Sequence, residues 1–192
     1  MKQERLDLLD RQPRAFLEGS IDYINDEWVF FTEDEAFPLE QFYFREIHIL
    51  LDEGWKKGVF LEPNRVLNEE WEYALTGSEW IKVRKTLPYS LKMLMQELSD
   101  EAFFAFVTNL NELGFSLYDS LYCYNQLLFS GNLPKDGVNF MIFDNGELIC
   151  NIQHFFTYRD KFLDRFEFTL NTNKRIILQK VHPPAHNKCE AE

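Results

Sequence analysis

The stretch that decides the fold is PYSLKMLMQELSDEAFFAFVTNLNELGFSLYDSLYCYNQLLF, residues 88–129. Its first part places Leu91, Leu94, Met95 and Leu98 at helical spacing, so that they form one apolar face. Pro88 suits a first helical turn, where a missing N–H costs nothing. The spacing therefore predicts a helix over residues 88–98.

Two further helices are expected in the same stretch. Ser99 is a good N-cap, and the two acidic residues after it favour a helix start, while Gly114 can end that helix in a left-handed conformation. Ser116 and Asp119 resemble a capping box for a helix reaching residue 129. Because these faces are rich in Phe, Leu and Tyr, we expect a central three-helix layer that covers a sheet.

Upstream of this layer the sequence favours short antiparallel strands. Strand patterns cover residues 15–24, 28–32, 42–51, 55–61, 71–75 and 80–87, and the last two are expected to pair across the turn at 76–78. Gly19, inside the first strand, indicates a bulge or a sharp bend. So many short strands in so few residues predict a small curled β-barrel, SH3-like in form.

Downstream, Asp144-Asn145-Gly146 is the strongest hairpin signal, because Asn-Gly adopts positive φ at little cost. Strand patterns at 138–143, 147–156, 166–170 and 175–181 predict a four-stranded antiparallel meander. The fold class is therefore α+β. We expect an N-terminal β module over residues 1–87, helices with the meander over 88–181, and a disordered tail over 182–192.

Composition excludes several classes of function. The net charge is −12, with 19 acidic and 11 basic residues up to position 88. Nucleic acids and anionic membranes bind chiefly through Lys and Arg, so neither is an expected partner. No apolar run approaches the ~20 residues of a membrane span, and the charged start is not a secretory signal. Three scattered cysteines fit a reducing cytoplasm better than a disulfide framework.

Motifs for catalysis and metal binding are weak. The sequence has no glycine-rich phosphate loop, no G-x-S-x-G and no H-E-x-x-H. Cys150 and His154 share a strand face but stand roughly 13 Å apart at the rise of a β-strand, too far for a nucleophile and its base. His182, His186 and Cys189 offer metal-ligand types, but a closed zinc site needs four. We therefore expect no catalytic residue, no metal and no cofactor.

The aromatic residues of the N-terminal module suggest a binding surface. All four tryptophans lie there, and a barrel of this size need not bury every one. An exposed aromatic strip beside acidic side chains would bind a protein partner, and a basic one best. We expect an interaction module whose partner-binding residues are Trp28, Phe30, Trp55, Trp71 and Tyr73. The sequence also leaves open homodimerisation through a strand edge.

The alternative is a small-molecule-binding or hydrolytic domain with a pocket between the helices and the C-terminal sheet. The polar residues expected in such a pocket are Tyr122, Asn125, Asn139, Asn151 and His154. His154 also shares its strand face with Ile152 and Phe156. This pattern favours a core histidine satisfied by a hydrogen bond.

Several segments together resemble a family of uncharacterised proteins from Bacillus-type bacteria: residues 11–15, 23–31, 87–91, 123–126 and 165–171. The resemblance covers nearly the whole chain except the tail. It implies a soluble bacterial cytoplasmic protein, and it brings no catalytic or binding residue with it.

Overall fold

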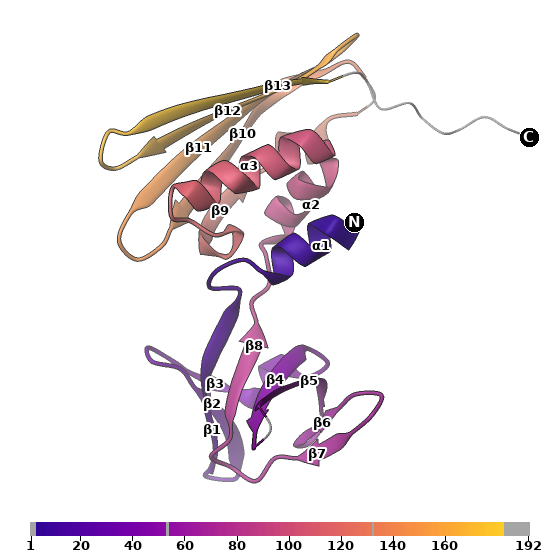
Figure 1. Ribbon diagram of the computed structural model, residues 1–192, viewed down its shortest axis with the longest axis vertical. Helices are drawn as coiled ribbons and strands as arrows, with labels where there is room; N and C mark the ends of the chain where they lie inside the picture. The colour runs from indigo at the N-terminus through magenta and orange to yellow at the C-terminus, as the bar shows by residue number, and fades with distance from the viewer. Residues whose placement is uncertain (1–2, 53, 132, 183–192) are drawn as a thin grey trace, which may run out of the picture. The chain divides into compact units, whose positions relative to one another are not determined.

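The computed structural model describes residues 3–52, 54–131 and 133–182, and it confirms the α+β class (Figure 1). The chain divides into two compact units. One is Arg14–Thr86, and the other combines the described residues up to Pro13 with those from Leu87 onward. Each unit contains one antiparallel sheet, and every α-helix of the described residues belongs to the second unit. We call them the eight-stranded unit and the five-stranded unit.

The eight-stranded unit is an open sheet in the order β3-β2-β1-β8-β4-β5-β6-β7. Its strands are β1 (Phe16–Ile24), β2 (Glu27–Phe31), β3 (Ala36–Pro38), β4 (Glu46–Leu51), β5 (Gly54–Leu61), β6 (Arg65–Leu67), β7 (Glu72–Ala74) and β8 (Trp80–Arg84), with one 3-10 turn, η1 (Leu39–Phe42), after β3. The sheet is not closed into the expected SH3-like barrel, because β3 and β7 are its two ends and do not pair. The inner face buries Phe30, Phe60 and Ile47 completely.

The expected pairing of β7 with β8 is also wrong. β7 pairs with β6, whereas β8 lies between β1 and β4. The physical reason lies in the connection between them. The Glu79 carboxylate accepts hydrogen bonds from the backbone N–H groups of Thr76 and Gly77, which holds these residues in a loop of its own instead of a tight hairpin turn. One edge of β7 is consequently left without a partner strand in the described sheet.

Gly19 occupies a position in β1 that has no space for a side chain. A Cβ atom there would lie 1.8 Å from the carbonyl oxygen of Phe31, on the neighbouring strand β2. The glycine therefore permits a close approach of two backbones. The pairing of β1 with β8 runs through Gly19 without a shift of register, so the expected bulge does not form there.

We expect Gly19→Ala to destabilise the eight-stranded unit by about 2 kcal/mol or more, because β1 and β2 must separate to admit the methyl group. The unfolding transition followed by tryptophan fluorescence measures this, since all four tryptophans lie in the unit. Glu18→Ala, at the neighbouring exposed position of the same strand, is the matched control. Equal effects of the two substitutions would contradict the close approach.

Three helices belong to the five-stranded unit: α1 (Gln3–Asp10), α2 (Tyr89–Glu97) and α3 (Asp100–Glu112). The expected helix-end signals are present, because Ser99 Oγ accepts the N–H of Ala102 and Gly114 has a φ of +85°. The Arg5 side chain of α1 donates to the carbonyl oxygens of Met95 and Leu98. Residues 3–13 therefore pack with this unit, and not with the N-terminal strands where the sequence placed them.

The expected third helix does not form. Residues 117–129 instead form a 3-10 turn η2 (Leu117–Asp119), the strand β9 (Ser120–Tyr124) and a second turn η3 (Gln126–Phe129). The capping box of Ser116 and Asp119 exists, but it caps only the single turn η2. Residues 120–124 form a strand because they pair with β10, where Tyr124 lies opposite Phe140. Aromatic side chains also favour strands, because they pack well on a pleated surface.

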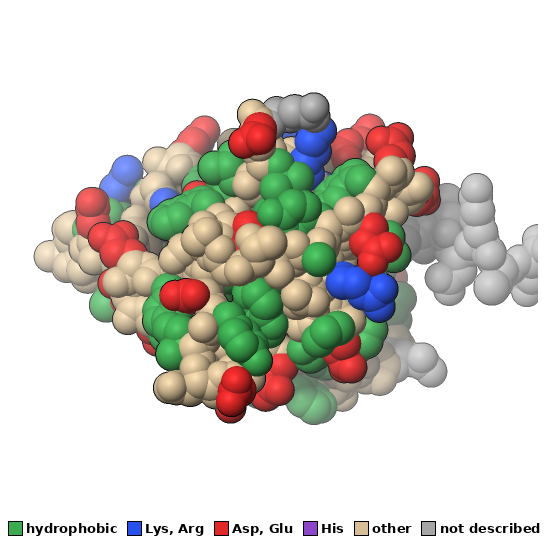
Figure 2. All heavy atoms as spheres, turned by 90° about the horizontal axis from the view of Figure 1, so that it is seen from below, with side chains coloured by type: hydrophobic (Ala, Val, Ile, Leu, Met, Phe, Trp, Pro, Cys, Tyr) green, Lys and Arg blue, Asp and Glu red, His purple; other side chains and the backbone are tan. Residues whose placement is uncertain are grey.

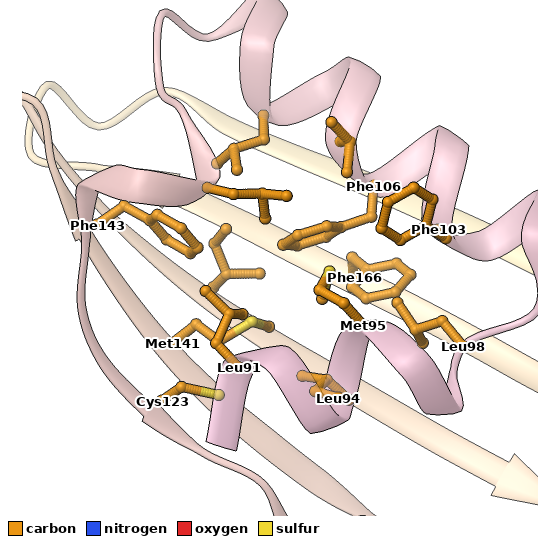
Figure 3. Close-up of a cluster of buried hydrophobic side chains, with 14 of the residues drawn as sticks. Leu91, Leu94, Met95, Leu98, Phe103, Phe106, Cys123, Met141, Phe143 and Phe166 are labelled. Carbon is orange, nitrogen blue, oxygen red and sulfur yellow. The ribbon is translucent and has the colours of Figure 1, made fainter. Parts of the chain in front are cut away.

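The sheet of this unit has five strands, not the expected four, in the order β13-β12-β11-β10-β9. Besides β9 these are β10 (Lys135–Asp144), β11 (Ile149–Tyr158), β12 (Phe162–Leu170) and β13 (Arg175–His182). The hairpin at Asp144-Asn145-Gly146 forms as expected, and Gly146 has a φ of +89°. Figure 3 shows the core between α2, α3 and the sheet, where Met95, Phe103 and Phe106 meet Phe166.

Candidate functional site

The eight-stranded unit contains a groove of about 1020 Å³ beside β7. The described residues that line it come from the end of β4 and the following turn, the start of β5, the segment around β7, and the loop into β8. They are Leu50, Leu51, Asp52, Lys56, Trp71, Glu72, Tyr73, Thr76, Ser78, Glu79 and Trp80. The groove exists because β7 and β8 do not pair. We call it the β7 groove.

A hydrogen-bond cluster around Glu79 fixes one wall of the β7 groove. This carboxylate accepts the Thr76 N–H at 2.7 Å, the Thr76 hydroxyl at 2.7 Å, the Gly77 N–H at 2.9 Å and the Tyr73 hydroxyl at 3.1 Å. Burial on its own raises the pKa of Glu79, but these hydrogen bonds outweigh it and lower the pKa below its ordinary value. The hydrogen bond to Glu79 thus fixes the position of the Tyr73 hydroxyl.

The electrostatic environment of the groove is negative. Its described lining includes three carboxylates, those of Asp52, Glu72 and Glu79, and one lysine, Lys56. Burial, the hydrogen bond to Glu79 and the charges of Glu79 and Asp52 together raise the pKa of the Tyr73 phenol. Figure 2 shows one face of the eight-stranded unit. On this face hydrophobic side chains lie among acidic ones, and basic side chains are fewer.

The five residues expected to bind a partner do not form one surface. Trp71 and Tyr73 line the β7 groove. Trp28 lies against Tyr23 in a separate, smaller pocket of about 390 Å³. Trp55 is exposed on the outer face of the sheet, where the Lys82 ammonium lies 4.3 Å from the centre of its ring. Phe30 is completely buried in the core, so we leave it out of the binding surface.

Several residues of the groove were not expected from the sequence. Trp80 is 47% exposed and belongs to the lining, together with Leu50 and Asp52. Trp80 begins β8 and alternates with buried Ile81 and Val83, so its position on the outward face was readable from the strand pattern. Glu79 gave no such signal. It accepts hydrogen bonds within a loop, and the sequence pattern there predicts only a simple hairpin turn.

The alternative pocket in the five-stranded unit is not assembled either. Tyr122 and Asn151 lie on the solvent-exposed face of the sheet. Asn125 is buried, and its side chain donates to the Ser90 carbonyl and accepts the Leu127 N–H. Asn139 and His154 are completely buried. These five residues therefore do not converge on one pocket.

Asn139 and His154 belong instead to a buried polar network that spans the sheet. The Asp164 carboxylate, on β12, is its centre. It accepts hydrogen bonds from His154 Nε2 at 2.8 Å, the Tyr158 hydroxyl at 2.6 Å and His182 Nε2 at 2.8 Å. Burial alone raises the pKa of Asp164, but the hydrogen bonds of the network lower it overall, and the one from His154 contributes most. Burial, followed by the charge of the same carboxylate and the hydrogen bond to it, raises the pKa of Tyr158.

The hydrogen bonds also fix the tautomer of His154. The Gln126 N–H donates to Asn139 Oδ1 at 2.7 Å, so the amide nitrogen of Asn139 must face the histidine. That nitrogen lies 3.0 Å from His154 Nδ1, which therefore accepts. The proton of His154 is thus on Nε2, where it meets Asp164.

An Asp–His pair is the arrangement that activates a nucleophile in many hydrolases. Here, however, both ring nitrogens of His154 are engaged, its ring stacks on Phe166 at 4.3 Å, and neither it nor Asp164 has any exposed surface. Cys123 and Cys150 are buried, and burial raises the pKa of each thiol to about 11. The network therefore binds the strands of the sheet together and offers no atom to a substrate.

The three residues of metal-ligand type, His182, His186 and Cys189, fall mostly outside the described residues. His182 is the last residue of β13 and hydrogen-bonds Asp164, whereas His186 and Cys189 lie beyond residue 182, as does the rest of the expected tail. Within the part of the chain that is described, no group of three or more His, Cys, Asp or Glu side chains is arranged to hold a metal ion. The described helices are also too short or too polar for any of them to traverse a bilayer.

Fold and site define an α+β protein with two open antiparallel sheets and a groove on one of them. By sequence, the chain belongs to the family described as "Protein of unknown function (DUF2777)", whose model matches residues 3–180. This confirms the resemblance to an uncharacterised Bacillus-type family. The chain is 36% identical over 106 residues to "Uncharacterized protein YisN" of Bacillus subtilis (strain 168). The overlap covers 55% of this chain and 54% of that protein. The chain thus matches about half the length of this relative. No solved structure matches the chain.

Proposed function

We propose that this protein is a non-catalytic interaction module that binds a protein partner in the β7 groove. The observation that carries the proposal is the groove itself. It has about 1020 Å³ of space, two of the expected binding residues, Trp71 and Tyr73, and the exposed indole of Trp80. Grooves lined by aromatic side chains bind peptides well, because rigid rings offer large contact areas at low entropic cost.

The charge of the chain supports a basic partner, and its three scattered cysteines favour the cytoplasm as the compartment. A net charge of −12 attracts cations over a distance and disfavours nucleic acids and anionic lipids. The acidic lining of the groove extends this preference to the site. Association should be fast and should weaken as salt concentration rises.

The test is a selection of binding peptides from a random display library, with the full chain as target. We expect the selected peptides to bind Trp80→Ala about tenfold or more weakly than the original protein, because a central aromatic residue dominates such interfaces. Trp55→Ala is the matched control, since this indole lies outside the described lining. Tryptophan fluorescence of the unfolding transition checks that both variants fold.

Two results would contradict the proposal. The first is equal affinity of the selected peptides for Trp80→Ala and the original protein. The second is a larger loss in Tyr89→Ala, an exposed aromatic substitution in the five-stranded unit. Either result would place peptide binding elsewhere on the chain.

A further inference from the structure

The unpaired edge of β7 indicates what kind of peptide the β7 groove can bind. β7 is the terminal strand of its sheet, so only one of its edges is paired in the described structure. An unpaired strand edge presents a row of N–H and C=O groups that another strand can use. The inference that follows rests on the proposed function.

The hydrogen bonds of β7 show which backbone groups point outward. The Trp71 carbonyl accepts the Asn68 N–H at 3.0 Å, and the Leu75 N–H donates to the Asn64 carbonyl at 2.8 Å. In an antiparallel pair, residues that face the partner alternate with residues that face away. Because Trp71, Tyr73 and Leu75 face β6, the backbone groups of Glu72 and Ala74 face away from it, along the free edge.

The side chains beside this edge would suit a peptide strand in which apolar and basic residues alternate. Trp71 and Tyr73 are half-buried on one side of β7, next to Leu50 and Leu51 across the groove. Asp52 and Glu72 supply carboxylates at the same place. An extended chain sends successive side chains to opposite sides, so apolar side chains can meet the rings while basic ones meet the carboxylates.

We propose that the partner of the β7 groove is an extended peptide segment in which apolar residues alternate with lysine or arginine, and that it adds to the sheet as a strand against β7. Its backbone pairs with the outward groups of Glu72 and Ala74. Its apolar side chains contact Trp71, Tyr73 and Trp80. The basic side chains complement Asp52 and Glu72, which makes the site selective against acidic segments.

The test uses a short capped peptide of alternating valine and lysine, and two versions of it. One is N-methylated at every valine and the other at every lysine. In a strand these two sets of N–H groups point to opposite edges, so only one set can pair with β7. Tryptophan fluorescence of the protein measures binding. We expect one version to bind about tenfold or more weakly than the parent and the other to bind equally well.

An alternating valine–glutamate peptide tests the charge preference, and it should bind more weakly than the lysine peptide. Equal binding of both N-methylated versions, equal weakening of both, or equal affinity for the glutamate peptide would overturn the inference. So would a failure of the lysine peptide to bind. None of these results affects the proposed function, which is decided by the selected peptides and Trp80→Ala.

A variant of the protein gives a second measurement. Ala74→Pro removes an outward N–H from β7 and leaves every side chain of the groove in place, and edge strands tolerate proline at such a position. We expect the lysine peptide to bind this variant about tenfold more weakly. Unchanged affinity in the folded variant would overturn pairing along β7. If the variant does not fold, the N-methylated peptides decide the question alone.

Discussion

Replacing Asp164 with asparagine is expected to destabilise the five-stranded unit by about 3 kcal/mol or more. The carboxylate has no exposed surface and accepts hydrogen bonds from His154, Tyr158 and His182. An asparagine keeps one acceptor oxygen and directs an NH2 group at donors, which leaves buried donors unsatisfied. Circular dichroism of the helices measures the effect, because every α-helix of the described residues lies in this unit.

Asp136→Asn is the matched control in the same sheet. Asp136 pairs with Arg159 at the surface, and the hydrogen bond from Arg159 lowers its pKa. Such an exposed pair contributes little to stability, so this substitution should have a much smaller effect. Similar destabilisation by both substitutions would show that Asp164 is not the centre of the network.

The contribution of Asp164 also has a defined pH dependence. Its pKa is lower in the folded protein than its ordinary value of about 4. The stabilisation is therefore present above about pH 4 and is lost as the pH falls through the lowered pKa. The difference in stability between the original protein and Asp164→Asn should shrink in acid. A constant difference down to low pH would contradict this.

Phe106→Ala is expected to destabilise the same unit by about 3–5 kcal/mol, because it leaves a cavity in a fully buried cluster. The ring of Phe106 lies 5.1 Å from that of Phe166 and 5.8 Å from that of Phe168, measured between centroids. Phe106 is thus one of the buried side chains through which α3 packs against the sheet. Circular dichroism of the helices again measures unfolding.

Phe129→Ala is the matched control for Phe106→Ala. Phe129 is 78% exposed, so the loss of its ring removes little buried area. An equal effect of both substitutions would mean that the cluster in Figure 3 does not hold α3 on the sheet.

The elements that the sequence predicted well are those specified by near neighbours. The helices α2 and α3 have apolar faces at helical spacing, and their end signals at Ser99 and Gly114 act within one turn. The hairpin between β10 and β11 likewise depends on three consecutive residues. Each of these signals is local, so no knowledge of the rest of the fold was needed.

The predictions that are wrong concern segments whose structure depends on pairing with strands far away in the sequence. Residues 120–124 fit a helical stripe, and only pairing with β10 makes them a strand. The segment containing β7 fits a hairpin with β8, yet β8 is held between β1 and β4. Because these partners lie far away in the sequence, periodicity alone does not reveal them.

The candidate site shows the same division. Aromatic content pointed to Trp71 and Tyr73, and the strand pattern of His154 favoured a satisfied core histidine, which the structure shows. The groove itself depends on the loop at Glu79 and on the free edge of β7. Neither has a short sequence signature, since each depends on which strands of the sheet pair, and those strands lie far apart in the sequence.

The central claim is that a peptide binds beside β7, and hydrogen–deuterium exchange on the full chain tests it most directly. A peptide selected against the protein is added, and the protection of each segment is compared with that of the free chain. We predict new protection in residues 71–80, above all at the outward N–H groups of β7, and in the turn after β4. Protection confined to the five-stranded unit would contradict the account.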